Sequence, residues 1–183
     1  MSLEGEPAEF IRNLAEKVNL LVFYENADYV KSLERLFLMR GLDENQPCLY
    51  VSSQPIQNIE KELDLAGFNV EYLKTKDLLK IFGNAVLNLN QANDIMVNFI
   101  KNAQKLGSHA RIIIHHNDYL MPQGSMTLED FSSTLYRQHD VSILSSYDVE
   151  SILNTDLMYQ LIRLHDYVMF APSFGKGIVI KTQ

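Results

Sequence analysis

Residues 19–24 read Asn19-Leu20-Leu21-Val22-Phe23-Tyr24, and a polar segment, Glu25-Asn26-Ala27-Asp28, follows at once. The apolar run is too short for a helix, and a continuous apolar run is typical of a strand that is buried on both faces. After the polar segment, apolar residues recur at helical spacing until Gly41, a residue type that commonly follows a helix end. A buried strand followed by a helix is therefore the first unit of the fold.

The same unit of strand and helix recurs along the chain, and we expect a mostly parallel sheet with helices on both faces. The expected strands are Asn19–Tyr24, Cys48–Val51, Asn69–Leu73, Arg111–His115, Val141–Leu144, Tyr167–Phe170 and Ile178–Lys181. The expected helices cover about 7–18, 30–40, 56–66, 90–106, 128–138 and 149–164. The last two strands, joined by a turn that contains Gly175 and Gly177, are predicted to form an antiparallel hairpin. The segment Thr75–Asn88 is compatible with a short helix or with a lid over the sheet.

The length of 183 residues predicts one domain. We assign residues 19–183 to that domain and residues 1–18 to an N-terminal helix, whose first five residues resemble a leader added for expression. Hydrophobic residues make up 46% of the chain and charged residues 21%, which is the balance of a globular protein rather than of a disordered one.

The net charge of −7 argues against direct contact with nucleic acid, which requires a basic surface. The single cysteine, Cys48, lies in an apolar run and cannot form an intramolecular disulfide, as expected in a reducing compartment. No apolar run approaches the length of about 18 residues that a membrane span needs, and the acidic N-terminus is unlike a secretion signal. We therefore expect a cytoplasmic protein that does not bind a membrane.

Polar residues collect where the predicted strands end. In an open α/β sheet, ligands bind beyond the carboxyl ends of the strands, so these residues form the candidate ligand site. They are Tyr24, Glu25, Asn26, Ser52, His115, His116, Asp118, Tyr147 and Asp148. A plainer alternative, that Asn, Ser and Asp cap the helices that follow, would explain about half of them. Capping does not explain the two adjacent histidines or the Tyr-Asp pair.

A phosphate-binding loop requires the pattern Gly-x4-Gly-Lys-Ser/Thr after the first strand, because its amides surround a phosphate only where the backbone turns freely. Lys31 and Ser32 match the end of the pattern, but Glu25 and Val30 replace the two glycines. Valine resists a positive φ, and Glu25 with Asp28 would repel a triphosphate. The loop is degenerate, so nucleotide hydrolysis is disfavoured and the Lys-Ser pair is interpreted as a surface feature of the helix.

Metal and triad chemistry have weaker support in the sequence. His115, His116 and Asp118 carry side chains that can bind a metal, but neighbouring strand residues point to opposite faces. Both histidines can therefore bind one ion only if the strand ends before them. We favour a hydrogen-bonding role in a polar pocket and predict no metal and no cofactor. No Gly-x-Ser-x-Gly segment presents a nucleophilic serine, so no catalytic residue is assigned.

The order of these segments resembles RecA/KaiC-like domains and, within them, the DcmR-type sensory branch known as the MEDS family. The motifs that carry the resemblance are Leu21-Val22-Phe23-Tyr24-Glu25, Arg40-Gly41-Leu42-Asp43-Glu44, Leu49-Tyr50-Val51-Ser52, Ile59 to Gly67, Ser145-Ser146-Tyr147-Asp148 and Leu164-His165 through Val168. The resemblance covers roughly Val18 to Phe170 and implies a three-layer RecA-like fold with a degenerate Walker A loop. It also places His115 near the end of the strand where an ATPase carries its metal-linked aspartate.

The same resemblance implies a non-catalytic sensor of small organic molecules, with hydrocarbon derivatives as the ligand class. It implies a role in signal transduction or transcription regulation in bacteria or archaea, with a signalling kinase or a transcription regulator as partner. Output would pass through another chain or through a homo-oligomer. Three alternatives stay open: residual ATP binding through Lys31 and Ser32, a metal-dependent hydrolase that uses the histidines and Asp118, and a self-assembling scaffold.

Overall fold

Strand β1 (Asn19–Tyr24) is buried at every position and lies inside a seven-stranded sheet of order β3-β2-β4-β5-β1-β6-β7. The other strands are β2 (Cys48–Ser52), β3 (Leu79–Phe82), β4 (Ala110–His116), β5 (Val141–Asp148), β6 (Tyr167–Ala171) and β7 (Ile178–Lys181). Strands β1 to β6 run parallel, and β7 runs antiparallel to β6. The structure, a computed structural model, describes residues 6–14, 17–83, 89–116, 122–152 and 155–182.

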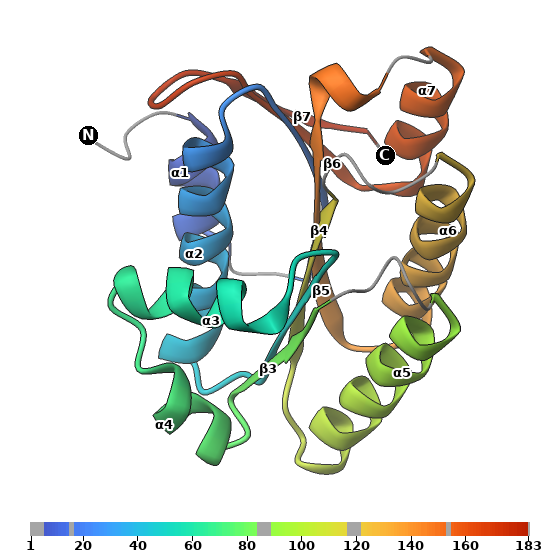
Figure 1. The fold of residues 1–183 in the computed structure, drawn as a ribbon. Coiled ribbons are helices and arrows are strands. Elements are labelled where there is room, and N and C mark those ends of the chain that lie inside the picture. The colour runs from blue at the N-terminus through green and yellow to red at the C-terminus, as the bar shows by residue number, and fades with distance from the viewer. Residues whose placement is uncertain (1–5, 15–16, 84–88, 117–121, 153–154, 183) are drawn as a thin grey trace.

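Helices cover both faces of the sheet and give the molecule three layers (Figure 1). One face carries α1 (Glu6–Arg12), α2 (Ala27–Asp43), α3 (Ile56–Leu65) and α4 (Val70–Thr75), and the other carries α5 (Leu89–Lys105), α6 (Pro122–Gln138) and α7 (Thr155–Leu164). A single 3-10 turn, η2 (Val149–Ser151), follows β5. The predicted three-layer, mostly parallel α/β fold with its C-terminal antiparallel hairpin is confirmed. No helix in the described ranges is long and apolar enough to cross a membrane.

The predicted strand at Asn69–Leu73 is wrong, because these residues begin helix α4. The side-chain oxygen of Asn69 accepts a hydrogen bond from the Tyr72 amide at 3.1 Å, which satisfies an amide that the first helical turn leaves free. The third strand along the chain is instead β3, which lies inside Thr75–Asn88, the segment that was expected to form a short helix or a lid. Residues 84–88 of that segment lie outside the described residues.

Gly41 does not follow the end of its helix, because α2 continues to Asp43. It lies where the helix approaches the sheet. A Cβ atom on Gly41 would lie 2.6 Å from Cδ of Arg111 and 2.9 Å from Sγ of Cys48. Arg111 is only 3% exposed, and its Nε donates a hydrogen bond to Gln46 at 2.7 Å, so it cannot easily move aside. A glycine is needed here for close packing rather than for turning the chain.

We expect Gly41→Ala to lower the free energy of unfolding by about 1–3 kcal/mol, because overpacking outweighs the gain of about 1 kcal/mol in helix propensity. Met39→Ala on the same helix is the control, since Met39 is largely exposed; it should change stability by less than about 0.5 kcal/mol. Urea unfolding measures both values. A Gly41→Ala variant as stable as the parent protein would show that Arg111 is free to move.

Candidate functional site

Most of the predicted polar residues at the strand ends belong to the strands themselves, whereas Glu25 and Asn26 follow β1. Strand β4 continues through His116, and β5 continues through Asp148, further than the sequence predicted. Successive side chains of a strand point to opposite faces. His115 and His116 therefore enter different layers of the molecule, each beside its register partner on β5, Ser146 or Tyr147.

The first cluster, which we call the Glu34 network, consists of Glu34, Tyr50, His115 and Ser146 on the face covered by α2. Glu34 is 1% exposed and accepts three hydrogen bonds. His115 Nδ1 lies 2.8 Å from its Oε1, the Ser146 hydroxyl donates to the same oxygen at 2.6 Å, and the Tyr50 hydroxyl donates to Oε2 at 2.5 Å. The partners come from β2, β4 and β5, so this carboxylate joins three strands to α2.

Electrostatics favour an ion pair in the Glu34 network. Burial alone would raise the pKa of Glu34, but the charge and hydrogen bond of His115, with the two hydroxyls, hold it below its usual range. Burial likewise acts to lower the pKa of His115, and Glu34 raises it above the ordinary value. The pKa of Tyr50 is raised well above 10.0 by burial and by Glu34, so its hydroxyl stays a donor.

The second cluster, which we call the Glu129 network, consists of Glu129, His116, Ser145, Tyr147 and His165 on the opposite face. Glu129, from α6, is fully buried. His116 Nε2 lies 2.8 Å from Oε1, the Tyr147 hydroxyl donates to Oε1 at 2.9 Å, and the Ser145 hydroxyl donates to Oε2 at 3.1 Å. His165 Nε2 lies 3.3 Å from Oε2. A second buried carboxylate is thus surrounded by donors.

The two histidines of the Glu129 network differ in their hydrogen bonds. His165 Nδ1 donates to the Leu161 carbonyl at 2.8 Å, so its Nε2 meets the carboxylate favourably only when it also carries a proton. Burial lowers the pKa of His116, and its buried Nδ1 has no partner among the described residues. Burial would raise the pKa of Glu129, but His116 and His165 together lower it far below its usual range.

The degenerate phosphate loop is occupied by contacts of its own. The Asn26 side-chain oxygen accepts the Tyr29 amide at 2.8 Å, which is an amide of the first turn of α2. Lys31 is paired with Glu62 at 2.7 Å, and the Ser32 hydroxyl donates to the Asp28 carbonyl at 2.8 Å. A helix N-terminus binds phosphate through free amides, and here a side chain of the protein has taken one of them.

Three of the predicted site residues act as caps or turn residues, as the plainer interpretation held. Asn26 caps α2, the Asp148 side chain accepts the Glu150 amide at 2.9 Å, and the Ser52 hydroxyl accepts the Gln54 amide at 3.2 Å. Glu25 is exposed. These residues line the rim rather than the two buried networks.

The structure brings Tyr24, His115, His116 and Tyr147 together in two separate stacks. Tyr24 stacks on His115 with ring centroids 6.1 Å apart, and Tyr147 stacks on His116 at 4.1 Å. All four side chains are buried. Asp118 lies outside the described residues. The ligand-binding role of these residues stays a prediction.

Both histidines lie within β4, so the condition under which they could bind one ion together is not met. Among the described residues, no group of three or more His, Cys, Asp or Glu side chains could hold a metal ion. A row with the order of a catalytic triad does occur: His109 lies 2.7 Å from Asp140 and 2.9 Å from Ser142. The Ser142 hydroxyl is fully buried and accepts the Val18 amide at 3.1 Å, so it is not placed to attack a substrate.

The sequence reasoning missed Glu34, Glu129 and His165. Glu34 lies on the apolar face of α2 beside Leu33 and Phe37, and all three are buried. A carboxylate in the apolar face of a predicted helix was the available signal, since ionised residues are rarely buried without partners.

The strand order, the three layers and the hairpin define a RecA/KaiC-like fold. No protein-family model and no curated protein matches the chain. Among solved structures, a KaiC-like protein from the archaeon Pyrococcus horikoshii OT3 is similar, with a TM-score of 0.62 and 11% identity over 85% of this chain and 71% of that chain.

Two further solved structures share this fold. The flagellar accessory protein FlaH from Methanocaldococcus jannaschii has a TM-score of 0.65 and 10% identity, over 98% of this chain and 86% of that chain. An uncharacterized protein from Pyrococcus horikoshii, in complex with an unknown peptide, has a TM-score of 0.68 and 15% identity, over 98% and 91%. At these identities the likeness establishes the fold alone.

We expect Glu129→Gln to lower the free energy of unfolding at pH 7 by about 3 kcal/mol, because the amide replaces one acceptor oxygen by an NH2 donor and leaves buried donors of the network without an acceptor. Its neighbour Asp130 is exposed, so Asp130→Asn is a matched control with an expected change below about 0.5 kcal/mol. Urea unfolding measures both. Equal losses in the two variants would contradict a role of the Glu129 carboxylate in holding this network.

We expect the pKa of His115 to lie above the ordinary histidine value of about 6.5 and the pKa of His116 to lie below it. The contribution of His115 to stability is then present below about pH 6.5 and is lost as the pH rises through its folded pKa. The contribution of His116 is instead lost as the pH falls below about 6.5. An NMR titration of the imidazole nitrogens measures both values, and the reverse order would refute the assigned pairing.

Proposed function

We propose that this chain is a non-catalytic sensory domain of RecA/KaiC-like fold that binds a small, uncharged organic molecule at the carboxyl ends of its strands. The observation that carries this proposal is the N-terminal part of α2, where the cap Asn26 and the residues Lys31 and Ser32 are all engaged by the protein's own groups. The membership in the DcmR-type MEDS family that the sequence suggests is part of this proposal.

The charges at the strand ends support an uncharged ligand. Glu34 is already paired with His115, and Glu129 already accepts hydrogen bonds from His116 and two hydroxyl groups. A buried carboxylate is stable only with such partners. An anion entering here would approach two carboxylates and the exposed Glu25. A neutral molecule would leave both networks intact.

A hydrogen-bond donor on the ligand would also fit this end of the sheet. With Nε2 of His116 donating to Glu129, Nδ1 of the neutral ring is an acceptor, and it is buried without a partner among the described residues. Tyr147 stacked on the same ring offers an aromatic wall. Binding would shift a population between two arrangements of the strand ends, which requires different affinities for the two.

The output would pass through another protein, for which a signalling kinase or a transcription regulator is the expected class, or through a homo-oligomer of this chain in the cytoplasm. The runner-up function is residual nucleotide binding, which the RecA/KaiC-like fold and the Lys-Ser pair of α2 favour. A metal-dependent hydrolase is less favoured, because the two histidines of β4 enter opposite layers.

A thermal-shift panel tests the proposal against its runner-up. The panel holds uncharged alcohols, amides and halogenated hydrocarbons on one side and ATP with magnesium on the other. A compound at ten times its Kd should raise Tm by roughly 3–5 °C, whereas ATP with magnesium should leave Tm unchanged.

The test variant is Tyr147→Phe, which removes a hydroxyl of the Glu129 network. The matched control is Tyr159→Phe on α7, where Tyr159 is 61% exposed. Only the first should weaken the response to a stabilising compound. A panel without any response would count against a sensor, and stabilisation by ATP with magnesium alone would favour the runner-up.

A further inference from the structure

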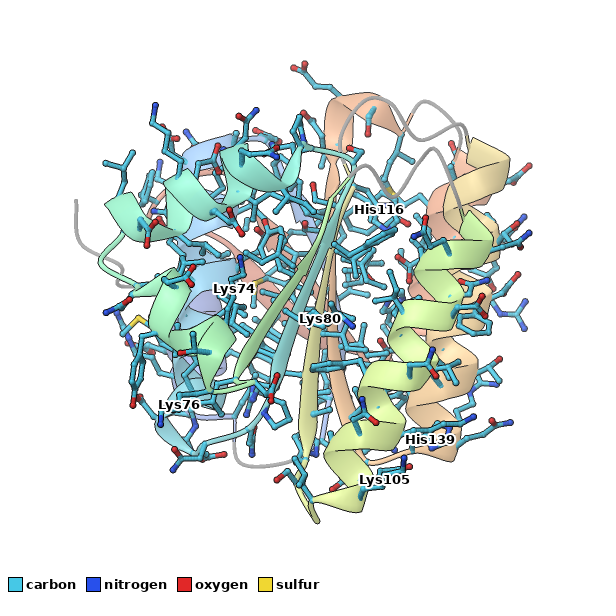
Figure 2. The ribbon with its side chains drawn as sticks, turned by 60° about the horizontal axis from the view of Figure 1, so that its bottom comes forward. Lys74, Lys76, Lys80, Lys105, His116 and His139 are labelled. Atoms are coloured by element: carbon cyan, nitrogen blue, oxygen red, sulfur yellow. The ribbon has the colours of Figure 1, made fainter. Side chains whose placement is uncertain are left out.

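The open edge of the sheet at β3 carries a groove of about 640 Å³. Residues of α3 and α4 form one wall, residues of α5 form the other, and β3 lies between them (Figure 2). In the described sheet, β3 pairs only with β2. One more strand, laid beside β3, would therefore lie inside the groove.

The backbone of β3 offers hydrogen-bonding groups to this groove. The Cys48 amide of β2 donates to the Leu78 carbonyl at 2.9 Å, so that carbonyl points toward β2. Because peptide groups alternate in direction along a strand, the amides and carbonyls of Leu79 and Ile81 point toward the open edge. Such unpaired groups are a template for strand addition.

The groove also has two faces of different chemistry. Leu79 and Ile81 pack into the core beneath α2, α3 and α4, so this side of the edge is apolar. Lys80 points to the other side, which it shares with Phe82, and Figure 2 shows it between the two helical walls. On that side Leu106, which directly follows α5, is 75% exposed.

Positive charge gathers on the α5 side of the groove. Lys80 and Lys105 line it, neither forms an ion pair with a described residue, and the lining residues of α5 include no carboxylate. On the other wall Lys74 is neutralised by Glu60 at 2.7 Å, and Asp77 lies near the start of β3. In a chain of net charge −7, two unpaired lysines beside an open edge favour an acidic occupant.

We propose that the β3 groove binds an extended acidic segment of another protein as an additional strand. Alternate side chains of that segment would be apolar, toward Leu79 and Ile81, and acidic, toward Lys80 and Lys105. This alternation follows from the period of two residues in a strand. The proposal is independent of the ligand site at the strand ends.

A second copy of this chain is a poorer occupant. Pairing two β3 edges would bring one Lys80 close to the other. Pairing β3 with the free edge strand β7 would bring Lys181 toward the lysines of the groove. Like charges on neighbouring strands are destabilising, so these pairings are disfavoured.

The test uses the whole chain and two fluorescein-labelled hexapeptides, Glu-Val-Glu-Val-Glu-Val and its counterpart with lysine in place of glutamate. Fluorescence anisotropy should show affinity for the acidic peptide about tenfold above that for the lysine peptide. Lys80→Glu should lower the affinity for the acidic peptide about tenfold, and the control Lys61→Glu, an exposed residue of α3 outside the groove, should leave it unchanged.

Hydrogen exchange locates the contact. The amides of Leu79 and Ile81 should gain protection when the acidic peptide binds, while the Lys80 amide, which points toward β2, should not. Ile81→Pro should abolish peptide binding and keep the fold, since the amide of Ile81 points away from β2. If Ile81→Pro unfolds, Lys80→Glu still tests the proposal.

Equal affinity for the two peptides, no anisotropy change up to millimolar peptide, or protection elsewhere would overturn the proposal. A dimer of the free chain that Ile81→Pro dissociates would overturn it as well, because it would identify a second copy as the occupant.

Discussion

Two glutamates without access to water determine the arrangement of the strand ends. An ionised carboxylate in a protein interior is destabilising unless it is paired and its oxygens accept hydrogen bonds. Glu34 and Glu129 meet this condition through a histidine of β4 and hydroxyl groups of neighbouring strands. Tyr50 of β2 and the polar residues near the carboxyl ends of β4 and β5, other than Asp148, are therefore parts of two buried hydrogen-bond networks, one in each layer.

The fold is RecA/KaiC-like, although the region after β1 departs from the Gly-x4-Gly-Lys-Ser/Thr pattern of a phosphate-binding loop. A nucleotide crevice needs free amides and unpaired positive charge beyond the strand ends. In this chain the first turn of α2 is capped by Asn26, and Lys31 is bound by Glu62. His115, near the end of β4, is held by the carboxylate of Glu34. The architecture persists because it depends on the apolar parts of the strands, which lie away from this edge.

The fold was predictable from the sequence because continuous apolar runs, such as Asn19–Tyr24, leave little alternative to a buried strand. The structure of Asn69–Leu73 was not predictable, because the spacing of its apolar residues suits a strand as well as a helix. The hydrogen bond by which Asn69 caps α4 selects the helix. The end of β5 was underestimated, because Ser145 and Ser146 look like turn residues until their buried acceptors are known. The histidines could be identified as unusual, but their partners could not. Glu34 and Glu129 are distant in sequence, and only the packing of α2 and α6 brings them to β4.

The direct succession of His115 and His116 has a mechanical consequence for β4. Moving this strand by one residue along its neighbours would exchange the faces of the two rings and leave Glu34 and Glu129 each opposite the wrong side chain. In either direction one of the two glutamates would lose its histidine, and the penalty of that unpaired buried carboxylate opposes such a slip far more strongly than apolar side chains alone, which can interchange with little loss. The register of β4 against its neighbours is thus fixed by buried carboxylates. Because Glu34 of α2 and Glu129 of α6 bind adjacent residues of β4, the same contacts fix both helices at one level along this strand.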